Sequence, residues 1–136
     1  MNWSQSLECG YERFDASNQC LLFVLQQIFD TDAECGDRVG CGPRADCGRV
    51  RSLLHFARRK FAFEERIMRR VGFPGLADHA EDHRHLLSRI ESRSLSRNCE
   101  DGMFEVRQIA DLWMPWHVVE FDRMFAQWAG GLFLEI

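Results

Sequence analysis

Lysine is nearly absent from this sequence: the 17 basic residues comprise 16 arginines and a single lysine, Lys60. There is also no basic N-terminal end followed by an apolar run, which is the pattern of a secretory leader. The longest uncharged apolar stretch, residues 21–29, is far too short to span a membrane. The formal net charge of -4 gives no broad basic surface for nucleic acid. We therefore expect a cytoplasmic protein that binds neither membranes nor nucleic acids.

The chain has 136 residues, of which 46% are hydrophobic and 28% are charged. This length and this balance predict one globular domain over residues 1–136. Three of the six cysteines, Cys35, Cys41 and Cys47, recur every six residues in a Gly-rich segment. That spacing matches no common zinc or iron–sulfur motif, so we expect free thiols in a loop, with a metal or redox role as the alternative.

Apolar residues recur at helical spacing in four segments, which are separated by breaks that contain glycine or proline. The first helix is expected to have its N-cap at Asp15 or Ser17 and to be followed by a loop from about 33 to 48. The second helix is expected from about 49 to 71, with a stop at 72–75. The third helix is expected to begin at 77 or 78, and a break at 98–102 separates it from the fourth. Two of the connections are short, and no segment is typical of a strand. The predicted fold class is therefore all-α, an up-down-up-down antiparallel four-helix bundle with an N-terminal arm.

The fourth segment is expected to align its apolar side chains and one histidine on a single face. That face comprises Val106, Ala110, Trp113, His117, Met124 and Trp128. Pro115 lies within the segment and should kink the helix, because proline removes an amide donor and crowds the preceding turn.

Polar side chains interrupt the apolar faces of the predicted helices. His79 and His83 are four residues apart, so both imidazoles project from one helix face and can reach one ion. His117 lies on the next helix with Asp122 five residues further on, and Glu64 lies on the core face of the preceding helix. Buried polar groups are unfavourable unless they are paired. Three histidines with neighbouring carboxylates favour a metal site over a hydrogen-bond network made by the protein alone.

Six motifs follow one another along nearly the whole chain: Trp3, GYERFDASN (10–18), KFAFEERIM (60–68), GFP (72–74), HAEDH (79–83) and WMPWHVVEFD (113–122). In order and spacing they resemble the successive signatures of bacterial hemerythrins. Members of that family hold two irons between four helices, with five histidines and two bridging carboxylates, and bind dioxygen reversibly. The resemblance implies iron ligands at His79, His83 and His117, and bridging carboxylates at Glu64 and Asp122.

The chain departs from the family at the other iron, whose two histidines would occupy positions 18 and 60. This sequence has Asn18 and Lys60 there. An amide offers at best a weak neutral oxygen, and an ammonium has three donors and no lone pair. The second iron has therefore lost its nitrogen ligands. Reversible dioxygen binding in the family uses both irons, so that activity is not carried over.

The position of the only lysine is informative, because an arbitrary basic residue in this chain would more often be arginine. We hypothesise that the Lys60 ammonium takes the place of the second iron and pairs with Glu64 and Asp122, since a compact point charge fits where a cation was. Without a metal, two carboxylates and one ammonium leave a net negative charge, which requires a protonated histidine. The alternative is that Lys60 lays its stem along the core and holds its amine in solvent.

The remaining ligand set suits one iron, with zinc or manganese as alternatives. We expect a protein that binds or senses dioxygen, nitric oxide or another small diatomic or anionic ligand, and we assign no catalytic residue. The aromatic residues that either line an apolar pocket for this ligand or belong to the ordinary core are Phe56, Phe61, Trp113 and Trp116. His55 and His85 lie off the ligand faces and are expected at the surface.

Two further functions are alternatives. A redox enzyme that acts on reduced oxygen species is suggested by analogy with iron superoxide dismutases, which hold one iron with histidines and a carboxylate. The other alternative is a metal-free interaction module. In that case the apolar tail Gly130–Ile136 would dock on the bundle or on a partner, including a second copy of the chain.

Overall fold

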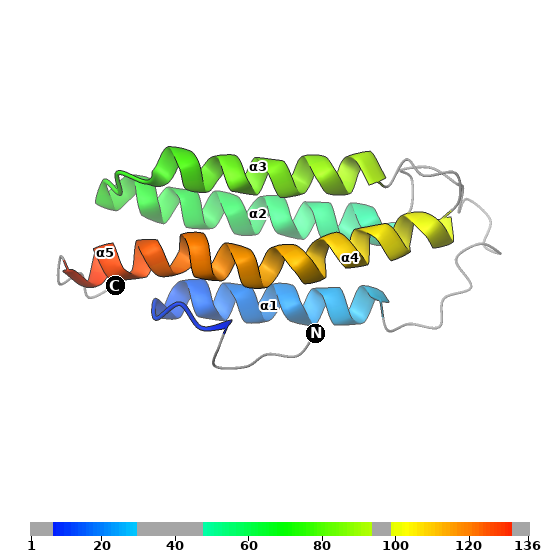
Figure 1. Cartoon of the computed structure of the whole chain (residues 1–136), viewed down its shortest axis with the longest axis horizontal. Helices are drawn as coiled ribbons and strands as arrows, with labels where there is room; N and C mark the ends of the chain where they lie inside the picture. The colour runs from blue at the N-terminus through cyan, green and yellow to red at the C-terminus, as the bar shows by residue number, and fades with distance from the viewer. Residues whose placement is uncertain (1–6, 30–47, 94–98, 132–136) are drawn as a thin grey trace.

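The computed structural model describes residues 7–29, 48–93 and 99–131 of the chain. Its elements are α1 (Glu12–Phe29), α2 (Gly48–Val71), α3 (Leu76–Arg93), α4 (Cys99–His117), the π-helical turn η3 (Val118–Asp122) and α5 (Arg123–Gly131). In Figure 1 they form four antiparallel rods, because α4, η3 and α5 follow one another along a single axis. The predicted all-α four-helix bundle is confirmed.

Within the described ranges no residue forms a β-strand, and none of the helices is long and apolar enough to cross a membrane. Helix α2 packs on α1 and α3, and α3 packs on α4. Cys35, Cys41 and Cys47 lie outside the described residues, as does the end of the tail from 132 to 136. The expectations for the three thiols and for docking of the tail therefore stay predictions.

The start of the first helix differs from the expected N-cap at Asp15 or Ser17, because α1 already begins at Glu12. Asp15 lies in the first turn of α1, and its carboxylate turns back toward the N-terminal arm. Oδ1 of Asp15 accepts a hydrogen bond from the Cys9 amide at 2.7 Å, and Oδ2 accepts one from the Gly10 amide at 3.2 Å. The carboxylate thus fixes the chain that enters the helix.

We expect Asp15→Ala to lower the free energy of unfolding by about 1–2 kcal/mol, because two backbone amides lose a charged acceptor at a partly exposed site. Urea denaturation followed by circular dichroism measures this loss. Glu12→Ala is the matched control, since it removes the same charge from an exposed position in the same turn. An equal loss in both variants would assign the effect to the helix N-terminus instead of the two hydrogen bonds.

The end of the second helix agrees with the sequence. Helix α2 ends at Val71, and Gly72 follows with a φ of 72°, a left-handed conformation that favours glycine. The Gly72 amide donates to the Arg69 carbonyl and the Phe73 amide to the Met68 carbonyl, which is the hydrogen-bond pattern of a Schellman motif. Helices α3 and α4 begin slightly earlier than predicted, at residues 76 and 99.

Two apolar clusters fill the bundle, one on each side of a polar layer. One cluster joins all four rods and includes Leu53, Ile90 and Val106. The other lies toward the end of the bundle formed by α5 and the N-terminal arm, and includes Phe14 and Phe125. On every rod the polar positions singled out in the sequence lie between these clusters, so the packing on both sides removes them from water.

The turn η3 changes which side chains of the last rod face the core. In a π-helix the amide of residue i+5 donates to the carbonyl of residue i, as the Arg123 amide does to Val118. The additional residue shifts the buried face, so Met124 is 57% exposed while Phe125 is fully buried. The predicted core position of Met124 is therefore wrong. Pro115 lies within α4, and the rod departs from α-helical geometry after it, at η3.

Candidate metal centre

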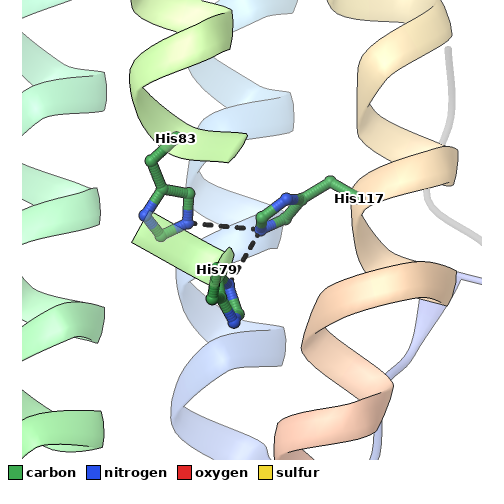
Figure 2. Close-up of side chains that lie close together, drawn as sticks. All are labelled: His79, His83 and His117. Carbon is green, nitrogen blue, oxygen red and sulfur yellow. Dashed lines mark hydrogen bonds between the residues drawn. The ribbon is translucent and has the colours of Figure 1, made fainter. Parts of the chain in front are cut away.

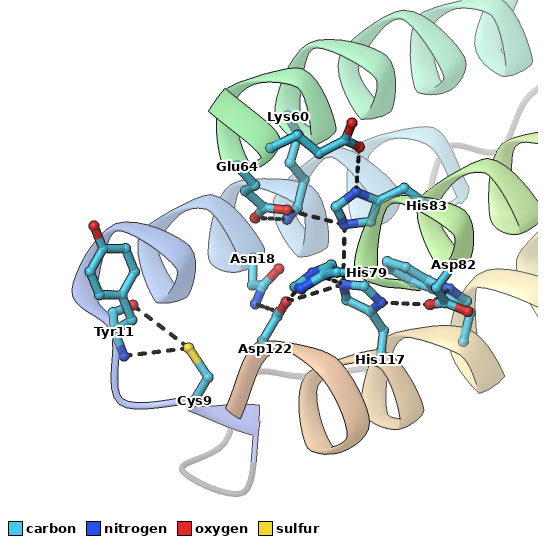
Figure 3. A network of polar contacts seen from close by, with 12 residues as sticks. Cys9, Tyr11, Asn18, Lys60, Glu64, His79, Asp82, His83, His117 and Asp122 are labelled. Carbon is cyan, nitrogen blue, oxygen red and sulfur yellow. Dashed lines mark hydrogen bonds and ion pairs between the residues drawn. The ribbon is translucent and has the colours of Figure 1, made fainter. Parts of the chain in front are cut away.

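Seven polar side chains are buried together in the layer between the two clusters. They are Asn18 on α1, Lys60 and Glu64 on α2, His79 and His83 on α3, His117 at the end of α4, and Asp122 in η3. None of them is more than 5% exposed. Figure 3 shows that all seven positions singled out in the sequence meet in one region of the bundle.

Helix geometry explains how the last rod supplies two of these side chains. His117 and Asp122 are five residues apart, a spacing at which an α-helix would turn their side chains well away from each other. The π-helical turn contains one more residue per hydrogen-bonded ring and returns Asp122 to the core face. The departure from α-helical geometry is therefore what brings this carboxylate beside the imidazole.

The Nε2 atoms of three histidines converge on one point (Figure 2). His117 Nε2 lies 3.1 Å from His79 Nε2 and 3.2 Å from His83 Nε2. If two ligand nitrogens each lie about 2.1 Å from one ion and subtend a right angle at that ion, the two nitrogens are about 3 Å apart. The distances between these histidine nitrogens therefore fit a shared metal ion. The other two histidines, His55 and His85, are exposed, as predicted.

One oxygen of each buried carboxylate faces the same point. Asp122 Oδ1 lies 3.1 Å from Nε2 of both His79 and His117, and Glu64 Oε1 lies 3.5 Å from His83 Nε2. Neither oxygen accepts a well-aligned hydrogen bond from another described residue. Because a buried oxygen without a donor is unfavourable, a bound cation would satisfy both atoms. Three imidazole nitrogens and two carboxylate oxygens fit one transition-metal ion.

The second oxygen of each carboxylate is held by a residue at a substituted position. Lys60 Nζ lies 2.5 Å from Glu64 Oε2, and the lysine side chain is only 1% exposed. The alternative in which this amine reaches solvent is therefore wrong. Asn18 Nδ2 donates a hydrogen bond of 2.8 Å to Asp122 Oδ2. The hypothesis that Lys60 pairs with both carboxylates is thus corrected, because Asn18 is the hydrogen-bond partner of Asp122.

Two carboxylates that were not predicted as site residues hold the outer nitrogens of two histidines. His117 Nδ1 donates to Asp82 Oδ2 at 2.6 Å, and His83 Nδ1 donates to Glu65 Oε2 at 2.8 Å. Such bonds orient an imidazole so that its Nε2 lone pair faces the metal. A signal was present, since Asp82 and Glu65 are each adjacent in sequence to a predicted ligand. Neighbouring charged residues are, however, also typical of a solvated helix face.

Aromatic rings pack against two of the imidazoles. Phe61 stacks on His83 with ring centroids 3.9 Å apart, and Trp113 stacks on His117 at 4.2 Å. Both aromatic residues are buried, whereas Trp116 is 49% exposed. The stacked rings restrict the orientation of the imidazoles and cover them from water.

Burial and neighbouring charges shift the pKa values of the three buried histidines in different directions. Burial lowers the pKa of His79, although Asp122 opposes this effect. Burial and the positive charge on His117 hold the pKa of His83 well below its ordinary value. Burial also acts on His117, but the carboxylates of Asp122 and Asp82 outweigh it and raise the pKa. Of the three histidines, His117 is therefore the one whose environment favours the protonated form.

The two buried carboxyl groups respond differently to the same environment. Burial raises the pKa of Glu64, and the positive charge of Lys60 offsets this rise only in part. Burial acts on Asp122 in the same direction, but the charge of His117 outweighs it and holds the pKa of Asp122 well below its ordinary value. If Lys60 and His117 both carry a positive charge and the two carboxyl groups are both ionised, these four side chains are together neutral without a metal.

Comparison with known proteins agrees with the motifs. The chain is 28% identical to a myohemerythrin of Riftia pachyptila over 120 residues, which cover 88% of this chain and 86% of the relative. It is 24% identical to a bacteriohemerythrin of Stenotrophomonas maltophilia (strain R551-3) over 125 residues, which cover 91% of this chain and 78% of that relative. No family model and no solved structure matches the chain. The four-helix bundle, the buried group of three histidines and the similarity to these two relatives support a hemerythrin-like family for the chain.

Proposed function

We propose that this hemerythrin-like protein holds a single non-haem iron and uses it to bind or sense dioxygen, nitric oxide or a related small ligand. The main support is the difference between the two oxygens of each buried carboxylate. Glu64 Oε1 and Asp122 Oδ1 face the histidine nitrogens, while the second oxygens are paired with Lys60 and Asn18. In a two-iron centre these second oxygens would bridge to the other ion.

The residues that would hold the iron are the three imidazoles and the two buried carboxylates. Iron in such a set supplies a redox-active Lewis acid to which a small ligand can bind. The carboxylates of Asp82 and Glu65 keep the nitrogens of His117 and His83 directed inward. The stacked ring of Phe61 helps to exclude bulk water from this side of the centre.

The charge beside the centre supports an anionic or strongly polarisable ligand. One divalent ion and two carboxylates are together neutral, and the Lys60 ammonium, 2.5 Å from Glu64 Oε2, adds a further positive charge. Because an unbalanced charge in a buried layer is unfavourable, an anion bound near the ion would restore neutrality. This favours azide, hydroxide or a reduced oxygen species among the candidate ligands.

The chain, loaded anaerobically with ferrous iron and then desalted, is expected to retain about one iron per chain. Inductively coupled plasma mass spectrometry with a protein assay measures the ratio. His83→Ala should lower it strongly, whereas His55→Ala, which removes an exposed histidine, should leave it unchanged. About two irons per chain would contradict the proposal, and no iron would favour the metal-free interaction module. Parallel loading with zinc and manganese tests the identity of the metal.

Absorption spectra separate ligand binding from turnover. Under the proposal, nitric oxide or azide shifts the spectrum of the iron-loaded chain and the original spectrum returns when the ligand is removed. Catalytic consumption of peroxide or superoxide by the loaded chain, absent in His83→Ala, would instead support the redox enzyme.

A further inference from the structure

A groove of about 720 Å³ lies along the seam between α1 and α2. Its lining residues recur every three or four positions, from Arg13 to Cys20 on α1 and from His55 to Phe63 on α2. They are therefore the facing stripes of two packed helices. The volume is within the range of small-molecule sites, roughly 300–1,000 Å³.

The lining of this α1–α2 groove is mainly apolar. Phe63 is 38% exposed, and Phe56 is partly buried where it packs against the neighbouring apolar cluster. Ala16 contributes only a methyl group on the facing helix. An apolar molecule lying here would remove the exposed ring surface from water, which is favourable in proportion to the apolar area covered.

The charged side chains of the groove all have one sign. Arg13, Arg59 and Lys60 line it, and no carboxylate of a described residue does. The whole chain has 21 acidic and 17 basic residues, so the charge of the groove is opposite in sign to the net charge of the chain. Lys60 is already paired with Glu64 in the buried layer. In the described part of the chain, neither Arg13 nor Arg59 forms an ion pair, so both guanidiniums can pair with an external anion.

We propose that the α1–α2 groove binds a small amphipathic monocarboxylate. Its apolar body lies against Phe56 and Phe63, and its carboxylate pairs with Arg13 and Arg59 at the rim. A guanidinium matches a carboxylate through two parallel hydrogen bonds. One carboxylate on an apolar body fits this site better than a polyanion does, because most of the lining offers no hydrogen bond.

Isothermal titration calorimetry with decanoate, kept below its micelle concentration, tests the proposal on the full chain. Decanoate is expected to bind, and the uncharged analogue decanol is expected to bind at least about tenfold more weakly, because it cannot form charge-assisted hydrogen bonds with the two guanidiniums. The same titration with metal-free and iron-loaded protein keeps this test separate from the one-iron proposal, on which the groove does not depend.

Variants locate the binding. Arg13→Gln/Arg59→Gln should weaken decanoate binding at least about tenfold and leave decanol binding unchanged. Arg66→Gln/Arg70→Gln removes the same charge from exposed positions of α2 outside the groove, and should leave both unchanged. Ala16→Trp fills the groove from an exposed position and should weaken both ligands, with Cys20→Trp as a second filling variant if the first loses helical circular dichroism.

Four results would overturn the proposal. Absence of decanoate binding would show that the groove does not bind a monocarboxylate. Equal affinity for decanoate and decanol would show that the groove is only a non-specific apolar surface. Binding that persists in both groove-filling variants, or that falls equally in the Arg66/Arg70 control, would place the carboxylate elsewhere on the chain.

Discussion

Lys60→Met is expected to lower the free energy of unfolding of the metal-free chain by about 3–5 kcal/mol, because it leaves the Glu64 carboxylate buried without its cation. Methionine keeps much of the volume of the lysine stem and adapts to irregular gaps, so the loss reports mainly on the charge. Urea denaturation in the presence of a chelator measures it. The expected loss is large because the pair is almost completely shielded from water.

Two further variants isolate the charge pair. Lys60→Met/Glu64→Gln should recover most of the loss, since neither partner is then charged. Arg66→Met removes a positive charge from an exposed position of the same helix, and it should change the free energy of unfolding by less than about 0.5 kcal/mol. If Lys60→Met were no more destabilising than Arg66→Met, the ammonium would not be stabilising the buried carboxylate.

Iron loading connects this stability difference with the proposed function. An ion held by the three histidines places positive charge beside Glu64, so the deficit of Lys60→Met relative to the native chain should shrink when both are loaded. A deficit of the same size with and without iron would mean that Glu64 does not take part in binding the ion.

The helices were largely predictable because their signals are local. The apolar stripe of α2 and the glycine after it give both of its ends to within a residue. The start of α1 was not predictable in the same way. A carboxylate such as Asp15 can accept from amides that follow it, as an N-cap, or from amides that precede it. Contacts of the N-terminal arm decide between the two, and Asp15 bonds to Cys9 and Gly10.

The last rod shows how one turn can change a periodic prediction. A stripe drawn at the spacing of an α-helix continues from His117 to Met124, and the turn η3 transfers burial to Phe125 instead. The same turn makes a site residue of Asp122, which α-helical spacing would direct elsewhere. The motif that resembles hemerythrins already contained this carboxylate, so the resemblance located it where periodicity alone could not.

The site was predicted in its members and only partly in its connections. Spacing and resemblance brought together all seven buried polar positions, but the burial of the Lys60 amine depends on packing between helices that a sequence does not show. Asn18 was considered only as an oxygen donor to metal, whereas its amide nitrogen is what contacts Asp122. Asp82 and Glu65 are not fully buried, so their side chains resemble ordinary surface charges until the fold places them beside the imidazoles.

Asn18→His/Lys60→His is expected to raise the iron content from about one to about two per chain, because it restores two nitrogen donors and releases the second oxygens of both carboxylates. Mass spectrometric metal analysis measures the ratio, and an absorption spectrum that differs from that of the one-iron chain should appear with it. Each single variant restores one nitrogen and one oxygen, so each should remain near one iron.

The control for the double variant is Asn18→Gln/Lys60→Gln, which also removes the lysine charge and the native asparagine but supplies no imidazole. It should stay near one iron per chain, because amide oxygens are weak ligands for this ion. If the glutamine variant also gained a second iron, loss of the ammonium alone would account for the change. If the histidine variant gained none while remaining folded, the distance between the helices, and not the two substituted side chains, would be what excludes a second ion. Exclusion of a second ion can therefore be assigned to Asn18 and Lys60 only if the histidine pair restores that ion and the glutamine pair does not.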